Sequence, residues 1–380
     1  MNIRVGNDIM QIKCSSMQYM VDEIRTNDKQ IIMFGAGVIG QITAFEILKT
    51  YNLVKNIHCF LDNDDTKWGR TIQIDGKDYL INSPQYLKEL NSKVVILINI
   101  SRFAEVKLQL EAMECTKDMV AYIMPMMCIH NMCSSISEGI PVFTDMQLIP
   151  KKIHYMWFGR KKIPDNLKKC IETWYKFCPD YEIIQWNENN YNIEKNVYMK
   201  QAYEAGAYGF IPDYARIDIL YNEGGIYMDT DVQLIKGLDD MLYQEAFCGV
   251  EKWQILNFGG CSGAVKGHPM IKKFLDERMN VHYMNPDGTL NRNTCGFYDT
   301  RTAIKEGYKV NGSTQSINGM NIFAFDYFHP YDYMSGMCSI TKHTYSIHHF
   351  DGGWMDTTMK AQNKITSTKY MKLYRECLGK

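Results

Sequence analysis

The sequence lacks long hydrophobic runs, a dominant charge and an apolar signal-peptide core near its first residue. The apolar run "VVILI" at 94–98 is far shorter than the roughly 20 residues that cross a bilayer, and "MNIRVGNDIMQIKCSSMQYM" at the start has no apolar core of signal-peptide length. We therefore expect a cytoplasmic protein. The 42 basic and 43 acidic residues leave a net charge of −1. That balance argues against a nucleic-acid binder, because such proteins usually carry a basic excess.

The sequence also lacks any CxxC pair, although it contains 12 cysteines. Cys128 and Cys133 flank His130, but no second pair of ligands follows at the spacing of a zinc site. We therefore expect no structural zinc. In a reducing compartment the cysteines are expected to be free thiols.

The composition predicts a globular chain with two domains. Hydrophobic residues make up 46% of the 380 residues and aromatic residues 12%, which excludes global disorder. Prolines and the turn-rich string "CSSISEG" interrupt the pattern between 125 and 150. We predict an α/β protein with domains at 1–148 and 149–380.

The first domain contains a glycine-rich loop between a predicted strand and a predicted helix. Gly35, Gly37 and Gly40 form the pattern "GAGVIG" after "KQIIMF", and Asp62 ends the next predicted strand. This is the layout of a dinucleotide-binding unit, in which the glycines approach a diphosphate and the acidic residue binds a ribose. Two further predicted strands, 93–100 and 118–124, complete a mostly parallel Rossmann-like sheet.

The second domain contains the string "FIPDYARIDILYNEGGIYMDTDV" at 210–232. Pro212 suits the first turn of a helix, and Asp213 suits its positive end. Gly224 and Gly225 would end the helix. A strand is predicted to follow, and its Asp229 and Asp231 would share one face because they are two residues apart.

Three explanations compete for the two aspartates. Exposed carboxylates on a solvated strand would repel each other, and the apolar neighbours predict a half-buried strand. An EF-hand loop beginning at Asp229 needs glycine at its sixth position, where Leu234 stands. A divalent metal that bridges a diphosphate would remove the repulsion. We favour the metal.

The joined string resembles the signature of glycosyltransferases with a "DXD sugar-binding region". These are GT-A-fold enzymes of capsular polysaccharide and mannosyl-transfer type, similar to the catalytic domains of large clostridial glucosylating toxins. Further matching segments follow in the expected order: "KKIHYMWFGRKKIP", "CIETWYKFCPDYEIIQWNE", "NFGGCSGAVKGHPMI" and "YSIHHFDGGW". The resemblance covers about 150–355 and implies a GT-A domain after the Rossmann-like one.

The resemblance implies a site for Mn²⁺ or Mg²⁺. Asp231 would bind the metal directly, and Asp229 would bind it through water or hold the donor. The family's closing motif supplies a third metal contact, for which His349 is the first choice and His348 the second. Asn257 in "LNFGG" is a candidate for a polar group below the sugar ring.

The resemblance also implies a nucleotide-sugar site, with a UDP-sugar favoured as donor. Its donor-facing side chains would stack on the base, bind diphosphate or sugar hydroxyls, or wall the site: Trp157, Asp213, Arg216, Tyr227 and Trp354. Asp213 and Arg216 could instead form only an intrahelical ion pair, and Trp157 could be a core residue. Gly352 and Gly353 stand where relatives often carry serine, which puts a hydroxyl contact to the diphosphate in doubt.

The implied reaction is retaining transfer of a sugar to a glycan acceptor. Two alternatives stay open: an NAD-dependent oxidoreductase that uses the N-terminal glycine loop, and a non-catalytic protein that binds a sugar nucleotide. The tail after Trp354 carries six basic and two acidic residues. It is either a solvated helix or a contact with an anionic membrane surface on the cytoplasmic side. The oligomeric state is open.

Overall fold

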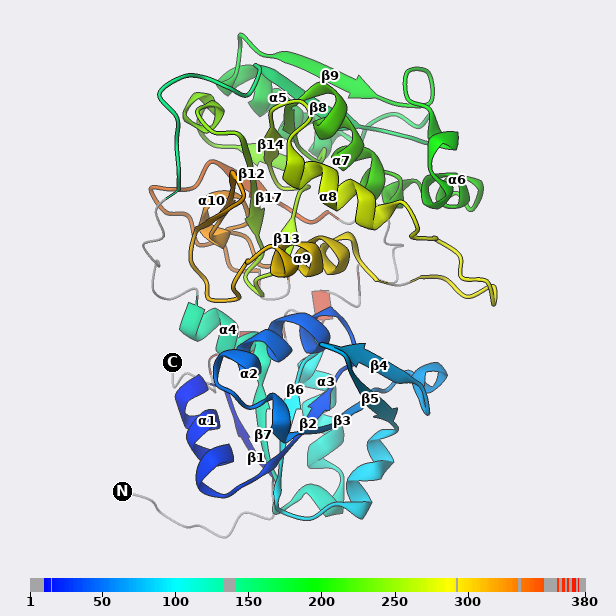
Figure 1. Ribbon diagram of the computed structural model, residues 1–380, viewed down its shortest axis with the longest axis vertical. Coiled ribbons are helices and arrows are strands. Elements are labelled where there is room, and N and C mark those ends of the chain that lie inside the picture. The colour runs from blue at the N-terminus through cyan, green and yellow to red at the C-terminus, as the bar shows by residue number, and fades with distance from the viewer. Residues whose placement is uncertain are drawn as a thin grey trace. The chain divides into compact units, whose positions relative to one another are not determined.

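The computed structural model divides the chain into two compact units, Met1–Ser135 with Lys364–Lys380, and Ile136–Asn363. It describes residues 10–14, 16–132, 141–291, 293–333 and 336–351, and helical parts of 361–375. Each unit is α/β (Figure 1). The predicted domain boundary, after residue 148, lies inside the second unit. That the independently folding domains meet there stays a prediction.

The first unit is built on a seven-stranded sheet in the order β1-β7-β6-β2-β3-β5-β4. Every neighbouring pair is parallel except the β4–β5 hairpin. The part β5-β3-β2-β6-β7 has the strand order of a doubly wound α/β sheet, with its switch point between β2 and β6. The strands are β1 Gln11–Lys13, β2 Gln30–Phe34, β3 Ile57–Leu61, β4 Thr71–Ile74, β5 Lys77–Asn82, β6 Val94–Ile98 and β7 Val120–Ile123.

The helices of the first unit follow the apolar periodicity of its sequence. In the first of them Met17, Met20, Val21 and Ile24 are buried, and the Ser16 hydroxyl caps the helix by accepting a hydrogen bond from the Tyr19 amide. The helices are α1 Met17–Thr26, the π-helical segment η1 Ile39–Ala44, α2 Phe45–Thr50, α3 Phe103–Glu111 and α4 Met124–Met132. Short 3₁₀ segments are η2 Val54–Asn56, η3 Asp65–Lys67, η4 Pro84–Glu89 and η5 Glu114–Thr116.

One cysteine of the first unit departs from expectation. Cys14 is disulfide-bonded, so the prediction that all cysteines are free thiols is wrong for this residue. Other cysteines in both units are free and mostly buried, as Cys59 and Cys248 are. Burial raises the pKa of the Cys59 thiol to about 11, which keeps it protonated at neutral pH.

The second unit is built on a mixed sheet with the main order β15-β16-β12-β14-β10-β8-β9, and β13 pairs with β12. Its β9, β8 and β10 are parallel, so their carboxyl ends meet at one edge. A separate two-stranded sheet joins β11 to β17. The strands are β8 Lys152–Met156, β9 Glu182–Trp186, β10 Gly225–Tyr227, β11 Val232–Leu234, β12 Ala246–Val250, β13 Leu256–Asn257, β14 Ser262–Ala264, β15 Gln315–Ile317, β16 Met320–Phe323 and β17 Ser346–His348.

The helices of the second unit place their apolar residues on the sheet. The predicted helix after Pro164 is confirmed as α5, and its Leu167, Cys170, Ile171 and Trp174 are buried as their spacing requires. Figure 1 shows α7 beside α8, with α9 beyond it. The helices are α5 Asp165–Phe177, α6 Val197–Glu204, α7 Pro212–Glu223, α8 Pro269–Arg278, α9 Cys295–Lys305 and α10 Phe325–Phe328, with 3₁₀ segments η6 Ile193–Lys195, η7 Tyr208–Phe210 and η8 Asp239–Leu242.

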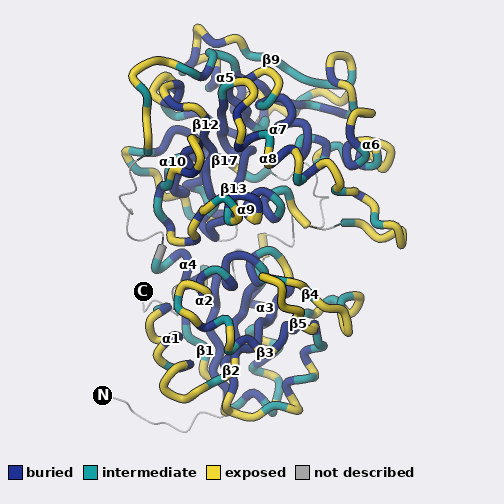
Figure 2. Tube along the Cα trace, in the orientation of Figure 1, coloured by how far each residue is buried: buried dark blue, intermediate teal, exposed yellow. Residues whose placement is uncertain are grey.

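The core of the second unit joins its two sheets. Trp174 packs fully buried in a cluster with Ile226, Val232 and Phe247, and its Nε1 donates a hydrogen bond to the Val232 carbonyl at 2.7 Å. In Figure 2 the central strands are buried and the connecting loops are mostly exposed. In the parts of the chain that the structure describes, no helix is both long and apolar enough to cross a membrane.

The segment 141–149 is attached to this core. The Asn321 side chain exchanges two hydrogen bonds with the Val142 backbone, at 3.0 and 2.7 Å. The Leu148 amide donates to the Leu242 carbonyl at 2.9 Å. These bonds explain why 141–148, which the predicted boundary assigned to the first domain, groups with the second compact unit.

Candidate functional site

The two aspartates lie in a turn between two sheets. The predicted helix and its glycine stop are confirmed: α7 begins at Pro212, and Gly224 ends it with a φ of +69°. The predicted continuous strand is wrong, because β10 ends at Tyr227 and β11 begins at Val232 in another sheet. The Val232 amide donates to the Asp229 carbonyl at 3.1 Å and closes the turn. The two carboxylates were expected to lie together on one face of a strand. In the structure the turn brings them together instead.

Asp229 is held by three neighbours. Its Oδ1 accepts a hydrogen bond from the Tyr227 hydroxyl at 2.8 Å, and its Oδ2 lies 3.6 Å from Nη1 of Arg216. Its amide donates to the Gly259 carbonyl at 2.8 Å. A Cβ atom at residue 259 would lie 2.1 Å from Asp229 Oδ2, so glycine is needed there for the carboxylate to fit.

Asp231 is paired with His348. Nε2 of His348 lies 3.3 Å from Asp231 Oδ1, and the Asp351 amide donates to Oδ2 at 2.8 Å. Burial alone would raise the pKa of Asp231, but the His348 imidazolium and the hydrogen bonds lower it to about 2. The same pairing raises the pKa of His348 against the effect of its burial.

Asp229, Asp231 and His348 form a cluster that could hold a metal ion. One ligand atom from each lies within 4.8 Å of the others. His348, the second choice from the sequence, is in the cluster, whereas Nε2 of His349 bonds Oε1 of Gln233 at 3.0 Å. Strand alternation explains this, because His348 pairs with Val232 in β17 and the next side chain points to the opposite face. The two carboxylates are ligands that suit a hard divalent cation such as Mn²⁺ or Mg²⁺.

Asp213 and Arg216 face the same cluster from α7. Arg216 Nη2 lies 3.3 Å from Asp213 Oδ1, so the predicted intrahelical pair exists, but Nη1 of the same guanidinium also reaches Asp229. The Tyr198 hydroxyl donates to Asp213 Oδ2 at 3.2 Å. Both members of the pair are buried, which makes this network stiffer than a surface ion pair.

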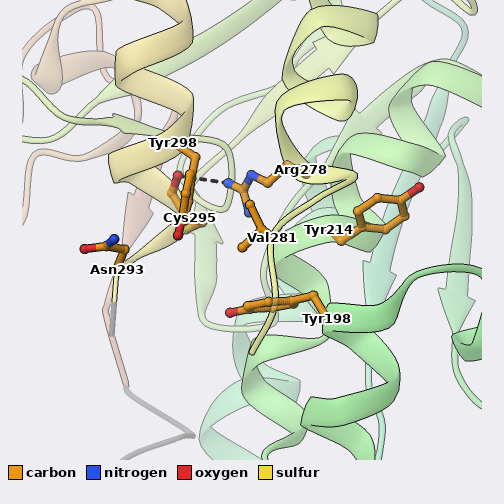
Figure 3. A pocket seen from close by; sticks show the side chains of 7 residues that line it. All are labelled: Tyr198, Tyr214, Arg278, Val281, Asn293, Cys295 and Tyr298. Carbon is orange, nitrogen blue, oxygen red and sulfur yellow. Dashed lines mark hydrogen bonds between the residues drawn. The ribbon is translucent and has the colours of Figure 1, made fainter. Parts of the chain in front are cut away.

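A second buried ion pair supports the start of α7. Arg278 from α8 donates to both carboxylate oxygens of Asp299 at 2.8 Å, and to the backbone carbonyls of Asp213 and Cys295. Figure 3 shows Arg278 beside Tyr198, Tyr214 and Tyr298, with its bond to Cys295 dashed. The arginine therefore ties α8 and α9 to the turn that carries Asp213.

The two predicted aromatic contacts differ in exposure. Trp157 follows β8 at the carboxyl edge of the sheet, is partly exposed, and donates Nε1 to the Lys161 carbonyl at 2.6 Å. Tyr227 is 1% exposed, and its ring lies under the Arg216 guanidinium at 5.4 Å, so only its hydroxyl reaches the cluster. Trp354, Gly352 and Gly353 lie outside the described residues.

Asn257 lies next to the cluster, together with a residue that the sequence reasoning missed. Its Oδ1 accepts from the Gly259 amide at 2.8 Å, and its Nδ2 donates to Glu251 Oε1 at 2.8 Å. Glu251 follows directly after β12, a buried strand. An acidic residue at a strand end is a signal that could have identified it.

In the first unit, the glycine-rich loop is hydrogen-bonded to Asp62, the acidic residue that follows the next strand. The Ala36 amide donates to Asp62 Oδ2 at 3.0 Å, and Lys67 Nζ lies 3.0 Å from the same oxygen. A Cβ atom on Gly40 would lie 2.2 Å from the Gly35 carbonyl oxygen, whereas one on Gly37 would meet nothing within 4 Å. The loop thus has the close packing of a dinucleotide-binding turn, but its aspartate is already bound by the protein.

Comparisons with known proteins agree with the cluster. Residues 164–248 match the family described as "Glycosyltransferase sugar-binding region containing DXD motif". "Uncharacterized glycosyltransferase L373" of Acanthamoeba polyphaga mimivirus is 28% identical over 48% of this chain and 74% of that protein. "Subversion of eukaryotic traffic protein A" of Legionella pneumophila is 25% identical over 37% of this chain and 26% of that protein.

A yeast protein is also similar to part of the chain. "Inositol phosphoceramide mannosyltransferase 1" of Schizosaccharomyces pombe is 27% identical over 30% of this chain and 38% of that protein. The match therefore spans about a quarter of the Legionella relative and under half of the yeast one. Residues 164–248, which contain Asp229 and Asp231, match the model of the glycosyltransferases that carry a DXD sugar-binding region.

Proposed function

We propose that this protein is a metal-dependent, retaining glycosyltransferase that moves a sugar from a nucleoside diphosphate sugar to a glycan acceptor. The observation that carries the proposal is the cluster of Asp229, Asp231 and His348. Its two aspartates follow the carboxyl end of β10 and lie inside the matched DXD region. Ligands of open α/β sheets bind at the carboxyl edge of the strands. The named mannosyltransferase relative supports a hexose as the transferred group.

The cluster fits a divalent cation. The buried Nδ1 of His348 has no hydrogen-bond partner among the described residues, and Nε2 is the ring nitrogen that faces Asp231. The imidazole and the carboxylates therefore present their ligand atoms to one another. Asp229, Asp231 and His348 would hold Mn²⁺ or Mg²⁺. When bound, such an ion supplies positive charge against the charge that grows on the departing diphosphate.

The other residues would bind and orient the donor. Trp157 presents a partly exposed ring at the same edge for stacking on the base. The Arg216 guanidinium is held by Asp213 and Asp229, so its charge is fixed in place beside the leaving group without reorganisation during the reaction. We favour a UDP-sugar first, from the resemblance of the segments that carry these residues.

Retention requires the acceptor oxygen to attack the face that the diphosphate leaves. The bond from the anomeric carbon to the phosphate oxygen breaks, and the bond to the acceptor oxygen forms on the same side. The acceptor proton goes to the departing phosphate oxygen. Positioning and fixed charge then supply most of the rate enhancement.

The test is release of nucleoside diphosphate from a panel of UDP- and GDP-sugars, with Mn²⁺, Mg²⁺ or EDTA. We expect release from one donor, dependent on metal and lost in Asp231→Asn. Proton NMR of the first-formed product would read the anomeric configuration. An inverted product would overturn retention alone, whereas equal release in EDTA would overturn metal dependence.

We propose that the first unit is an accessory domain and not an NAD-dependent oxidoreductase. The supporting observation is that Asp62, the residue that would bind a ribose, already accepts bonds from Ala36 and Lys67. Binding of NAD by calorimetry should be undetectable at millimolar concentration. Tight NAD binding would restore the oxidoreductase as the alternative.

We propose that the protein works in the cytoplasm. The basic composition of the tail supports contact with an anionic membrane surface as an extension of this proposal. Flotation with phosphatidylserine vesicles, compared between the full chain and a chain cut after residue 355, would test the contact. Equal flotation of both would exclude the tail as its cause.

A further inference from the structure

Asn257 is fixed at both ends of its side-chain amide. Nδ2 donates to Glu251 Oε1 at 2.8 Å, and Oδ1 accepts from the Gly259 amide at 2.8 Å. Its backbone carbonyl also lies 3.3 Å from Nε2 of His329, whose ring is buried. The nitrogen and oxygen of an asparagine amide can exchange places by a flip of the side chain. An ionised Glu251 carboxylate can only accept hydrogen bonds, so the amide nitrogen of Asn257 must be the atom that faces it.

The chain that follows Asn257 supports the DXD turn. The Gly259 carbonyl accepts the hydrogen bond of the Asp229 amide, and the Gly260 carbonyl accepts one from the Ser346 hydroxyl at 3.0 Å. A Cβ atom on Gly260 would lie 2.0 Å from Cε1 of His329. The two glycines therefore form a closely packed floor, and any shift of Asn257 moves the peptide that holds Asp229.

Glu251 is itself held rigidly. Its amide donates to the Ile255 carbonyl at 2.9 Å, and its carbonyl accepts from the Gln254 amide at 2.8 Å, where Gln254 has a φ of +66°. Cross-strand pairing sets Gly249 of β12 opposite Asn257 of β13. The carboxylate thus leaves a tight turn at a defined place beside the Asn257 amide.

The energetic cost of this arrangement points to a role. Burial raises the pKa of Glu251, while the bond from Asn257 acts in the opposite direction. Among the residues that the structure describes, Glu251 forms no ion pair with lysine or arginine within 4.0 Å. His348 lowers the pKa of Glu251 electrostatically, but it forms no ion pair with this carboxylate within 4.0 Å. A half-buried carboxylate without a paired cation is unfavourable compared with an apolar side chain of the same size.

We propose that Glu251 is a positioning residue of the transferase site: it orients the Asn257 amide and, through the Gly259-Gly260 floor, the Asp229 carboxylate. The inference rests on the proposed function, because its effect is on the transfer step. It predicts that the acceptor oxygen of residue 251 is needed and that its negative charge is not. Glutamine keeps such an oxygen, and methionine keeps only the volume.

The test compares Glu251→Met, Glu251→Gln and the control Glu223→Met, which removes an exposed carboxylate at the end of α7. Donor hydrolysis is measured with the nucleotide sugar that the wild type uses. The number of competent sites is measured by binding of the released nucleoside diphosphate in the presence of Mn²⁺, and kcat is expressed per competent site. We expect kcat per site to fall at least about tenfold in Glu251→Met, as small displacements at a reacting centre do. Glu251→Gln should stay within about threefold of the wild type, and the control should be unchanged.

Counting sites separates positioning from folding, because a misfolded fraction binds no nucleotide. An active wild type with an equally active Glu251→Met would overturn this inference alone. Equal losses in Glu251→Met and Glu251→Gln would overturn it too, because the charge and not the orientation would then matter. A wild type that releases nucleoside diphosphate from no donor would overturn the proposed function, and this inference with it.

Discussion

At the residue scale, the site depends on which side chains meet at the turn after β10. Asp229 is neutralised by Arg216 and bonded by Tyr227, while Asp231 is paired with His348. These contacts give the two aspartates different surroundings, although one residue separates them. The pairing lowers the pKa of Asp231 and raises that of His348, so each side chain stabilises the charged form of the other.

The choice between the two adjacent histidines gives a prediction at this scale. His348→Ala should weaken Mn²⁺ binding by about tenfold or more, since one of three protein ligands is lost. His349→Ala is the matched control and should change the affinity little, because its ring bonds Gln233. Isothermal titration with Mn²⁺ measures both. A larger loss in His349→Ala would show that the ligand is the one first chosen from the sequence.

At the element scale, β8 is bound to its neighbours through a buried histidine. Trp186 of β9 donates Nε1 to Nδ1 of His154 at 3.1 Å, and Nε2 of the same ring lies 2.9 Å from the Gly224 carbonyl. Nε2 therefore carries the proton, and the neutral ring satisfies both partners. Burial lowers the pKa of His154 to about 4.

This histidine should make the second unit less stable in acid. Because the folded pKa is below the unfolded value of about 6.5, its contribution is complete above pH 6.5 and is lost as the pH falls towards 4. The loss should approach about 3 kcal/mol. Urea unfolding at several pH values, compared with His154→Gln, isolates this titration from that of carboxylates. Parallel pH profiles of the two proteins would contradict the prediction.

The helix α5 should be as important to the fold as any strand. Trp174 fills the core between the two sheets of its unit and bonds the Val232 carbonyl at the start of β11. Trp174→Ala should lower the free energy of unfolding by about 3–5 kcal/mol. The control Tyr175→Ala, one residue along and 58% exposed, should lie within about 0.5 kcal/mol of the wild type. Similar losses in both would mean that helix propensity, and not core packing, is being measured.

At the scale of the whole molecule, two α/β units with different sheets share one chain. The first has the strand order of a nucleotide-binding sheet but a closed glycine loop, and the second carries the DXD region. This distribution assigns the proposed chemistry to the second unit alone. Changes in the packing of the first should therefore affect its own stability more than turnover.

Two glycines of the first unit test this division. Gly40→Ala should destabilise the unit by about 1–3 kcal/mol, because its Cβ would meet the Gly35 carbonyl oxygen. Gly37→Ala should be tolerated, since the space around it is open. Hydrogen exchange in β2 and β6 measures the local stability, and donor hydrolysis measures the second unit. A loss of hydrolysis in Gly40→Ala matching the loss of protection would show that the units are functionally coupled.

Much of the fold could be predicted from local patterns. The spacing of Leu167, Cys170, Ile171 and Trp174 determined a helix with one buried face, and the sequence from Pro212 to Gly224 determined both ends of α7. Four parallel strands of the first unit, β2, β3, β6 and β7, were predicted from their apolar runs and the glycine loop, whereas β1 and β5 were not. These features depend on neighbours in the sequence, so a single chain shows them.

The details of the site were decided by tertiary contacts. Whether Asp229 and Asp231 lie in a strand or a turn depends on where β11 finds its partner, and that partner is β17, more than a hundred residues later. The same pairing selects His348 over His349, because the register of two strands sets which side chains face inward. Glu251 joins Asn257 only because β12 pairs with β13. The sequence by itself determined which chemical groups the site uses, and long-range strand pairing decided which of them meet.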